Sequence, residues 1–369
     1  MSYINRLFRN KKPYNVEETN DCFLKAMREN CVFQYEHCED YRRILDLKGF
    51  KPMHLKEYED LKKLPFIPSL YFKQHKMFSM PERKLLIKAT SSGTSGNKSQ
   101  VGLNFGSLYR ALRMTITIGK YHGLLSLKPS HYLIFGYEPN KKNDIAFSKT
   151  AYAFTYMAPA LSRTYALRYT NTGYELDLEQ MREKLLKYSK GKVPVRFIGF
   201  PSYTYFLLKQ MKEEGIKVKL PKGSIMTLGG GWKQFYAERV SKEKFYALVY
   251  EVLGIEDKNV VEFFGAVEHM ILYTDCKYHH FHVPVYGRVI IRDADTLEPV
   301  EDGQPGLVNL LTPIVDSMPL LSVMTDDLGI LHNEKCPCGV DSPWLEILGR
   351  VGIKDIVTCA AGAETFLKN

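Results

Sequence analysis

The sequence predicts an α/β protein in which strands and helices alternate around a largely parallel sheet, followed by a smaller β-rich part. Between about residues 130 and 230, apolar segments of strand length alternate with longer amphipathic segments. After about residue 270, strand-like segments follow one another with only turns between them. The alternation is the sequence pattern of βαβ units, and the change after residue 270 indicates a separate subdomain.

The length and composition fit a globular protein. The chain has 369 residues, 45% of them hydrophobic, which is enough for one large core or two domains. No apolar run approaches the roughly 20 residues of a membrane span, and the first residues lack the apolar region of a secretory signal. The seven cysteines are scattered, which indicates reduced thiols. We therefore expect a cytoplasmic protein without a transmembrane segment.

The net charge of +10, with a pI near 9.0, raises the question of an acidic partner. The charges are dispersed along the chain. The densest basic groups are pairs such as Lys11-Lys12 and Lys141-Lys142, and acidic residues are interleaved elsewhere. An ordinary solvated surface, able to meet an acidic partner or ATP, fits this pattern better than a nucleic-acid interface.

The first part of the chain is expected to be mainly helical. Residues 1–60 have mixed charge and scattered aromatic residues, and helix is expected again over residues 107–125. Between them, the proline- and aromatic-rich residues 65–73 are expected to form a rigid segment that leads toward a polar loop.

The alternating region predicts strands at 131–137, 195–200 and 225–228, with helices at 178–188 and 203–214. In the β-rich part, strands are expected at 281–285, 288–293 and 306–311, and the subdomain is assigned to about 270–350. Ligands of parallel α/β folds gather at the carboxyl ends of strands. Small residues follow two of the predicted strands there, and we assign Gly230 and Gly231 to the ligand site.

A polar loop at residues 90–99 lies between two apolar segments. Its glycines allow backbone N–H groups to approach phosphate oxygens, its hydroxyls donate hydrogen bonds, and its lysine supplies a point charge. A Walker A loop has four residues between its glycines and a helix behind them. Here two intervene and a strand-like segment follows, which predicts a phosphate loop on a hairpin. The alternative is a flexible linker. The predicted phosphate ligands are Ser91, Ser92, Gly93, Thr94, Ser95, Gly96 and Lys98.

Three later motifs suit a nucleotide. In residues 262–268, Phe264 can stack on adenine, Gly265 allows close backbone approach, and Glu268 can hold Mg²⁺. In Thr325-Asp326-Asp327-Leu328, Asp327 at a turn can accept both ribose hydroxyls. In Leu348-Gly349-Arg350, Arg350 can pair with ribose or phosphate. Taken singly, the alternatives are a core strand followed by a turn, a solvated Asp-rich turn and a surface turn.

The four motifs follow one another in the order found in the adenylate-forming superfamily of acyl-CoA synthetases, luciferases and peptide-synthetase adenylation domains. Three further segments resemble the acyl-protein synthetase (LuxE) family: Gly-Gly-Gly-Trp-Lys at 229–233, LPFIPSLYFK at 64–73 and FHVP at 281–284. The resemblance runs from about Ile67 to the end of the chain.

The resemblance implies the large N-terminal nucleotide-binding domain of adenylate-forming enzymes over residues 1–350, with the small β-subdomain inside it. Residues 351–369 would form a short C-terminal segment. The superfamily's mobile C-terminal lid, with its catalytic lysine, is expected to be absent, because the chain stops at Asn369, soon after Arg350. Ligation to coenzyme A, which uses that lid, is accordingly less favoured.

The resemblance also implies an activity. A fatty acid would be activated with ATP and Mg²⁺ as an acyl-adenylate, and the acyl group would pass to an enzyme cysteine and then to a LuxC-like acyl reductase. Lys98, the loop hydroxyls and an Mg²⁺ ion bound by Glu268 would neutralise charge on the phosphates. Cys359 would be the acceptor, since the family has its acyl-accepting cysteine near the C-terminus in a similar Cys-Ala context. The alternatives are an acyl- or aryl-CoA ligase of the phenylacetate-CoA ligase type and a catalytically idle nucleotide-binding scaffold.

A fifth group of residues suits a metal. Three cysteines and three histidines in two short segments could supply a tetrahedral zinc site of the Cys₃His type. The Cys-x-Cys spacing is tighter than the usual Cys-x₂-Cys, and zinc-containing relatives of the phenylacetate-ligase type have similar residues in similar places. Reduced turn cysteines beside a histidine-rich strand are the alternative. The predicted ligands are Cys276, Cys336, Cys338 and His282, with His280 as second choice.

Overall fold

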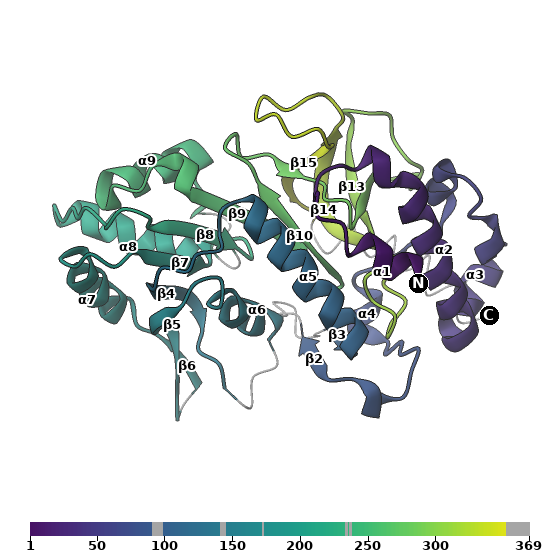
Figure 1. The fold of residues 1–369 in the computed structure, drawn as a ribbon, viewed down its shortest axis with the longest axis horizontal. Coiled ribbons are helices and arrows are strands. Elements are labelled where there is room, and N and C mark those ends of the chain that lie inside the picture. The colour runs from purple at the N-terminus through teal and green to yellow at the C-terminus, as the bar shows by residue number, and fades with distance from the viewer. Residues whose placement is uncertain (91–98, 141–144, 172, 233–234, 236–237, 352–369) are drawn as a thin grey trace. The chain divides into compact units, whose positions relative to one another are not determined.

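The computed structural model describes residues 1–369 except 91–98, 141–144, 172, 233–234, 236–237 and 352–369 (Figure 1). The chain divides into two compact units. Unit 1 comprises Met1–Tyr121, Gly265–Tyr273 and His280–Asn369, and unit 2 comprises His122–Phe264 and Thr274–His279.

Unit 1 begins with helices whose apolar faces are buried, as expected for the first part of the chain. They are α1 (Tyr3–Leu7), α2 (Asn20–His37), α3 (Glu39–Leu47), α4 (Tyr71–Gln74) and α5 (Phe105–Tyr121), with the 3-10 helices η1 (Glu17–Thr19), η2 (Pro52–His54), η3 (Tyr58–Lys63) and η4 (Glu82–Lys84). In α2 the buried residues Phe23, Met27 and Cys31 recur every four residues, which places them on one side of the helix.

The β-rich part of unit 1 is mainly antiparallel. Its strands are β11 (Phe281–His282), β12 (Arg288–Arg292), β13 (Pro305–Leu311), β14 (Ser322–His332) and β15 (Trp344–Arg350), paired in the order β12-β13-β14-β15-β11. The short strand β1 (Ile67–Pro68) pairs with β14 in parallel. A separate hairpin consists of β2 (Ile87–Thr90) and β3 (Gln100–Leu103). The strands expected after residue 270 are therefore present.

Unit 2 contains the predicted parallel sheet. Its strands are β4 (Ser130–Tyr137), β5 (Ala160–Thr170), β6 (Gly173–Leu176), β7 (Val195–Gly199), β8 (Ile225–Gly229) and β9 (Val260–Ala266), in the order β9-β8-β7-β4-β5-β6. All neighbours are parallel except β5 and β6. The strand β10 (His269–Asp275) follows β9 after a turn.

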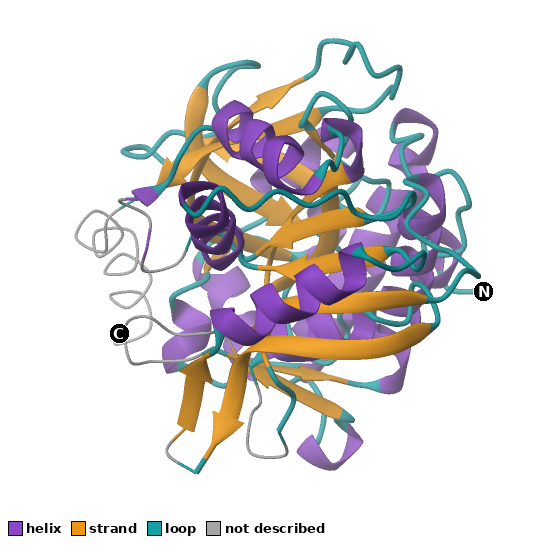
Figure 2. Ribbon diagram, turned by 90° about the vertical axis from the view of Figure 1, so that its left-hand side faces the viewer, coloured by secondary structure: helices purple, strands orange, loops and turns teal. Residues whose placement is uncertain are grey.

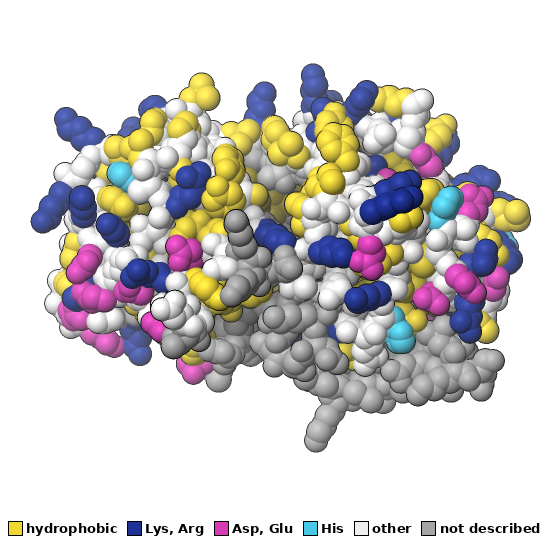
Figure 3. Space-filling view, turned by 90° about the horizontal axis from the view of Figure 1, so that it is seen from below, with side chains coloured by type: hydrophobic (Ala, Val, Ile, Leu, Met, Phe, Trp, Pro, Cys, Tyr) yellow, Lys and Arg dark blue, Asp and Glu magenta, His cyan; other side chains and the backbone are white. Residues whose placement is uncertain are grey.

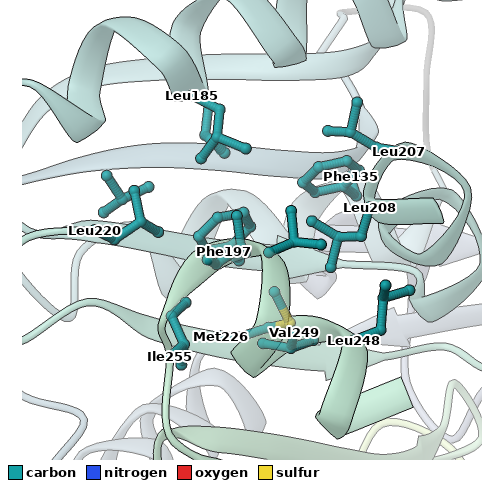
Figure 4. Close-up of a cluster of buried hydrophobic side chains, with 14 of the residues drawn as sticks. Phe135, Leu185, Phe197, Leu207, Leu208, Leu220, Met226, Leu248, Val249 and Ile255 are labelled. Carbon is teal, nitrogen blue, oxygen red and sulfur yellow. The ribbon is translucent and has the colours of Figure 1, made fainter. Parts of the chain in front are cut away.

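Helices cover the sheet of unit 2, and Figure 2 shows helices lying across the strands. They are α6 (Ala146–Phe154), α7 (Leu178–Ser189), α8 (Pro201–Glu213) and α9 (Lys242–Leu253), with the 3-10 helix η6 (Asp257–Asn259). Strand residues such as Phe135, Phe197 and Met226 pack against Leu185 of α7, Leu207 and Leu208 of α8, and Val249 of α9 (Figure 4). Burial of this apolar surface is the main stabilising contribution to the unit.

The carboxyl edge of this sheet requires glycine. A Cβ on Gly199, at the end of β7, would lie 2.3 Å from the carbonyl oxygen of Phe135. After β8 ends, Gly230 and Gly231 have φ of 78° and 68°, in the left-handed region that favours glycine. The two glycines assigned from the sequence therefore do lie at a strand end.

Two details differ from the sequence-based prediction. Asp327 was placed at a turn, but it lies inside β14, which is paired on both sides. The strand expected over 281–285 is limited to Phe281–His282. The prediction of a turn at Asp327 was wrong, because pairing of β14 with two neighbouring strands outweighs the turn propensity of Asp and Gly. Among the described helices, none is long and apolar enough to cross a membrane.

Candidate active site

The hairpin of β2 and β3 flanks the predicted phosphate loop. The two strands pair from Ile87 opposite Leu103 to Thr90 opposite Gln100, as predicted for a loop on a hairpin. The loop residues Ser91, Ser92, Gly93, Thr94, Ser95, Gly96 and Lys98 lie outside the described residues. Ser99, the next residue, is described and is buried.

Glu268 is a buried carboxyl group in the turn between β9 and β10. Burial raises its pKa, because the charged form loses solvation. A hydrogen bond with Ser99 and the charge of Lys73 oppose the increase, and the charge of Asp326 adds to it. The end of the predicted phosphate loop therefore meets the predicted magnesium ligand within unit 1.

Arg350 joins two strands at a carboxylate pair. Asp327 of β14 and Arg350 of β15 are opposite each other in the antiparallel register. The Nε of Arg350 lies 2.9 Å from Oδ1 of Asp327, and its Nη2 lies 3.5 Å from Oδ1 of Asp326. Asp327 is buried, and burial raises its pKa although Arg350 favours the charged form. Two motifs that were separate in the sequence therefore form one ion-paired group.

These residues give unit 1 a compact set of charges suited to a nucleotide and a divalent cation. Carboxylate oxygens are the ligands that Mg²⁺ prefers, and a cation near Glu268 would stabilise its ionised form. Arg350 can pair with an anion or with a sugar oxygen on the side not occupied by Asp327. We call Ser99, Glu268, Asp326, Asp327 and Arg350 the carboxylate–arginine group.

The remaining predicted nucleotide ligands belong to β8 and β9. Gly229, at the end of β8, is opposite Phe263 of β9, so Gly230 and Phe264 follow at the same edge. Phe264 is half-buried. Gly265 is exposed, and a Cβ there would lie 3.2 Å from the carbonyl oxygen of Ile271. Glycine at 265 therefore allows the close approach of β10, in addition to any role in ligand binding.

The four predicted zinc ligands are brought together. Cys276 lies in the turn after β10, His282 on β11, and Cys336 and Cys338 in the connection from β14 to β15. Their ligand atoms all lie within 4.8 Å of one another. The Sγ of Cys338 is 3.2 Å from Nε2 of His282. His280, the second choice, has its Nδ1 3.3 Å from Sγ of Cys336.

The surroundings of these four residues also suit a metal. The Nδ1 of His282 is 3.3 Å from the carbonyl oxygen of Ser342, which leaves Nε2 free to face the cysteines. Burial lowers the pKa of His282 to about 4, so its imidazole is neutral. Backbone N–H groups of Tyr278, Cys338 and Val340 donate to the sulfurs of Cys276, Cys336 and Cys338. Neutral imidazole and N–H donors to sulfur fit zinc coordination by thiolates.

The sequence analysis assigned no individual role to three residues that surround Glu268: Ser99, Lys73 and Asp326. Lys73 is the last residue of the LPFIPSLYFK segment, and Asp326 is adjacent to the predicted Asp327. Both residues were therefore visible in or beside predicted motifs. Their proximity to Glu268 could not be predicted, because it depends on contacts between segments far apart in the sequence. Cys359 lies outside the described residues.

Comparison with known proteins identifies the family. The profile of the family described as acyl-protein synthetase, LuxE, matches residues 2–367. The chain belongs to this family. The acyl-protein synthetases are ligases, so the enzyme class predicted from the sequence is confirmed.

Two similar proteins are the long-chain-fatty-acid–luciferin-component ligases of Aliivibrio fischeri and Vibrio harveyi. The first is 26% identical over 361 residues, covering 96% of this chain and 92% of that protein. The second is 25% identical over 352 residues, covering 94% and 88%.

More distant matches define the fold of this acyl-protein synthetase. The phenylacetate-coenzyme A ligase of Thermus thermophilus is 23% identical over 331 residues, covering 86% of this chain and 67% of that protein. The crystal structure of an open conformation of 2-hydroxyisobutyryl-CoA ligase has a TM-score of 0.70 at 18% identity, covering 92% of this chain and 71% of that chain. The α/β fold of the adenylate-forming enzymes is therefore confirmed.

We expect Asp327→Asn to weaken ATP binding more than it slows catalysis. A ribose contact is made equally in the ground state and the transition state, so its loss raises KM with a smaller effect on kcat. Steady-state kinetics with varied ATP would measure the two effects. Asp295→Asn, an exposed aspartate in a turn, is the control. A fall in kcat at unchanged KM would contradict a ribose-binding role.

Proposed function

We propose that this acyl-protein synthetase activates a fatty acid as its acyl-adenylate and transfers the acyl group to one of its own cysteines. The observation that carries the proposal is the carboxylate–arginine group, in which Glu268 meets Ser99 at the end of the predicted phosphate loop. The luciferin-component ligases, whose name specifies long-chain fatty acids, align over nearly the whole chain and support the substrate class.

In the first step a carboxylate oxygen of the fatty acid attacks the α-phosphate of ATP, and pyrophosphate leaves. Lys98 and the loop hydroxyls would hold the phosphates, and Asp327 and Arg350 would position the ribose. Mg²⁺, held by Glu268, would supply a charge that offsets the negative charge developing on the phosphate oxygens. Phe264 would stack on adenine, with Gly230 and Gly231 at the neighbouring strand end.

In the second step the thiolate of Cys359 attacks the acyl carbonyl of the adenylate. The bond from carbonyl to phosphate oxygen breaks, AMP leaves, and a thioester forms. A tethered thiolate gains from proximity and needs no coenzyme A. The thioester would then be delivered to an acyl reductase, and all of this would take place in the cytoplasm.

Pyrophosphate exchange across a panel of carboxylic acids tests the proposal. We expect exchange that depends on a fatty acid and does not require coenzyme A. The CoA ligase alternative, supported by the similarity to phenylacetate-CoA ligase, predicts AMP release that requires coenzyme A. An idle scaffold predicts ATP binding without exchange for any acid, and that result would reject the proposed function.

We further propose that Cys276, His282, Cys336 and Cys338 hold one structural zinc ion. Four protein ligands leave no open position for chemistry. We expect elemental analysis to find about one zinc per chain, and chelation or Cys338→Ser to lower the melting temperature. Cys22→Ser is the control. A metal-free protein whose stability is unaffected by chelator would contradict the site.

A further inference from the structure

The amino-terminal ends of four neighbouring strands of unit 2 form a basic edge. The strands β5, β4, β7 and β8 are adjacent and parallel, so the segments that lead into them lie side by side at one edge of the sheet. Neighbouring strands are about 4.8 Å apart, which makes this edge roughly 15 Å wide. We call it the amino-terminal edge, and it consists of residues 124–129, 155–159, 190–194 and 219–224.

The charged side chains of the amino-terminal edge are all basic. Its four segments contain no aspartate or glutamate. Figure 3 shows one face of the molecule, on which basic and acidic side chains are interspersed. The lysines of this edge are all exposed; they are Lys128, Lys190, Lys192, Lys219 and Lys222. None of these lysines forms an ion pair with a described residue.

The charge changes at the next strand. The segment leading into β9 carries Glu256 and Asp257, and Glu256 pairs with Lys258. Lys217, just before the edge, is paired with Glu251. Among the segments that lead into these parallel strands, the described lysines without an ion pair therefore lie before β4, β7 and β8.

Apolar side chains project from the same edge. Leu127 is 95% exposed and Tyr156 is 67% exposed, and Leu125 is partly exposed. The N–H of Ser126 donates to the carbonyl oxygen of Met157 at 2.9 Å, which fixes the leucine-bearing segment beside the tyrosine-bearing one. Exposing a leucine almost completely costs the free energy that its burial would give, so this tip suits an apolar environment.

Tyr156 belongs to an ordered group at this edge. Its hydroxyl lies 3.0 Å from that of Tyr152. The guanidinium carbon of Arg163 is 5.5 Å from the centroid of each of the two rings. A tyrosine with a fixed polar end, beside a cation, has the amphipathic character of side chains found where membranes meet water.

We propose that the amino-terminal edge docks this protein on the surface of an anionic lipid bilayer. The Leu125–Leu127 tip would enter the boundary between headgroups and hydrocarbon, and the lysines would lie among the anionic headgroups. The net charge of +10 attracts the whole protein to such a surface. A polyanion such as nucleic acid would use the lysines but would leave the exposed leucines without a role.

Docking in this orientation leaves the carboxyl edge of the same sheet, with Gly230 and Gly231, facing away from the lipid. On the proposed function, docking would hold the enzyme close to the membranes into which fatty acid partitions. The docking itself does not depend on that function, because it follows from the charge and exposure of the edge.

Co-sedimentation with lipid vesicles tests the docking. We expect binding to vesicles of phosphatidylglycerol and phosphatidylcholine that weakens with added salt, and little binding to phosphatidylcholine alone. Lys190→Gln with Lys192→Gln should weaken binding about fivefold per lysine removed. Leu127→Ser should weaken it by roughly tenfold.

Matched controls are available in unit 1. Lys11→Gln with Lys12→Gln removes the same charge, and Leu47→Ser removes a leucine that is 52% exposed. Equal losses in the control and edge variants would show attraction by net charge alone and would overturn the docking surface. Absence of binding to anionic vesicles at low salt would overturn it as well.

Two further outcomes are distinguishable. Tighter binding to an oligonucleotide than to vesicles, unaffected by Leu127→Ser, would assign the edge to nucleic acid and reject the bilayer. Pyrophosphate exchange with dissolved acid should be unchanged in the edge variants, because they leave the carboxylate–arginine group intact. The docking and the proposed function can therefore fail separately.

Discussion

Replacing Glu268 by glutamine should slow acid-dependent pyrophosphate exchange by about 10²–10³-fold, the usual effect of losing one preorganised electrostatic stabiliser. Glutamine has nearly the same shape but cannot supply the negative charge that holds Mg²⁺. The buried position of Glu268 makes this charge more effective than it would be in water. From the sequence motif, Lys98→Ala is expected to have an effect of the same order.

Glu346→Gln is a suitable control, because Glu346 is an exposed glutamate on β15 that contacts His332. It should exchange pyrophosphate at the parent rate. Parent activity in Glu268→Gln as well would place the magnesium ligand elsewhere.

The pKa of Glu268 adds a dependence on pH. Burial raises this pKa, so the folded protein favours the protonated form relative to the unfolded chain. The contribution of Glu268 to stability is therefore present at low pH and lost as pH rises through the folded-state pKa. Metal binding has the opposite sign, because only the ionised carboxylate binds Mg²⁺. We expect Glu268→Gln to be at least as stable as the parent at neutral pH while being far slower. A thermal melt beside the exchange assay would separate this result from simple unfolding.

The parallel sheet could be predicted because its strands are short, apolar and bounded by clear turn residues. β4 and β7 were placed within a residue or two of their actual ends, and the glycines after β8 do lie at a strand end. These features depend on local sequence, in which burial on both faces gives a continuous apolar run.

Features that depend on long-range pairing could not be predicted. Asp327 sits among turn-forming residues, yet its strand pairs with a neighbouring strand on each side, and this pairing keeps the backbone extended. The Asp327–Arg350 ion pair follows from that register. The amino-terminal edge could not be predicted for the same reason, because the strand order brings together lysines that are far apart in the sequence.

The cysteines of the described chain narrow the choice of acyl acceptor. Burial raises the pKa of Cys31 to about 12, although a hydrogen bond with Tyr41 opposes it, and burial also raises the pKa of Cys38 and of Cys22. A thiol with a raised pKa is a poor nucleophile at neutral pH because little thiolate is present. The other three described cysteines form the proposed zinc site, namely Cys276, Cys336 and Cys338. Of the seven cysteines, this leaves Cys359 without another assignment.

Cys359→Ser should abolish the thioester while leaving acyl-adenylate formation intact. Incubation with ATP, Mg²⁺ and a radiolabelled fatty acid should leave a hydroxylamine-labile acyl group on the parent protein and none on the variant, whereas pyrophosphate exchange should be equal in both. The reason is that adenylate formation needs the carboxylate–arginine group, and only the second step needs a thiolate. Cys22→Ser, which removes a half-buried thiol, is the matched control and should label as the parent does. Full labelling of Cys359→Ser would assign the thioester to another cysteine and reject Cys359 as acceptor. Loss of both exchange and labelling would instead show that residue 359 is needed for the fold or for the first step.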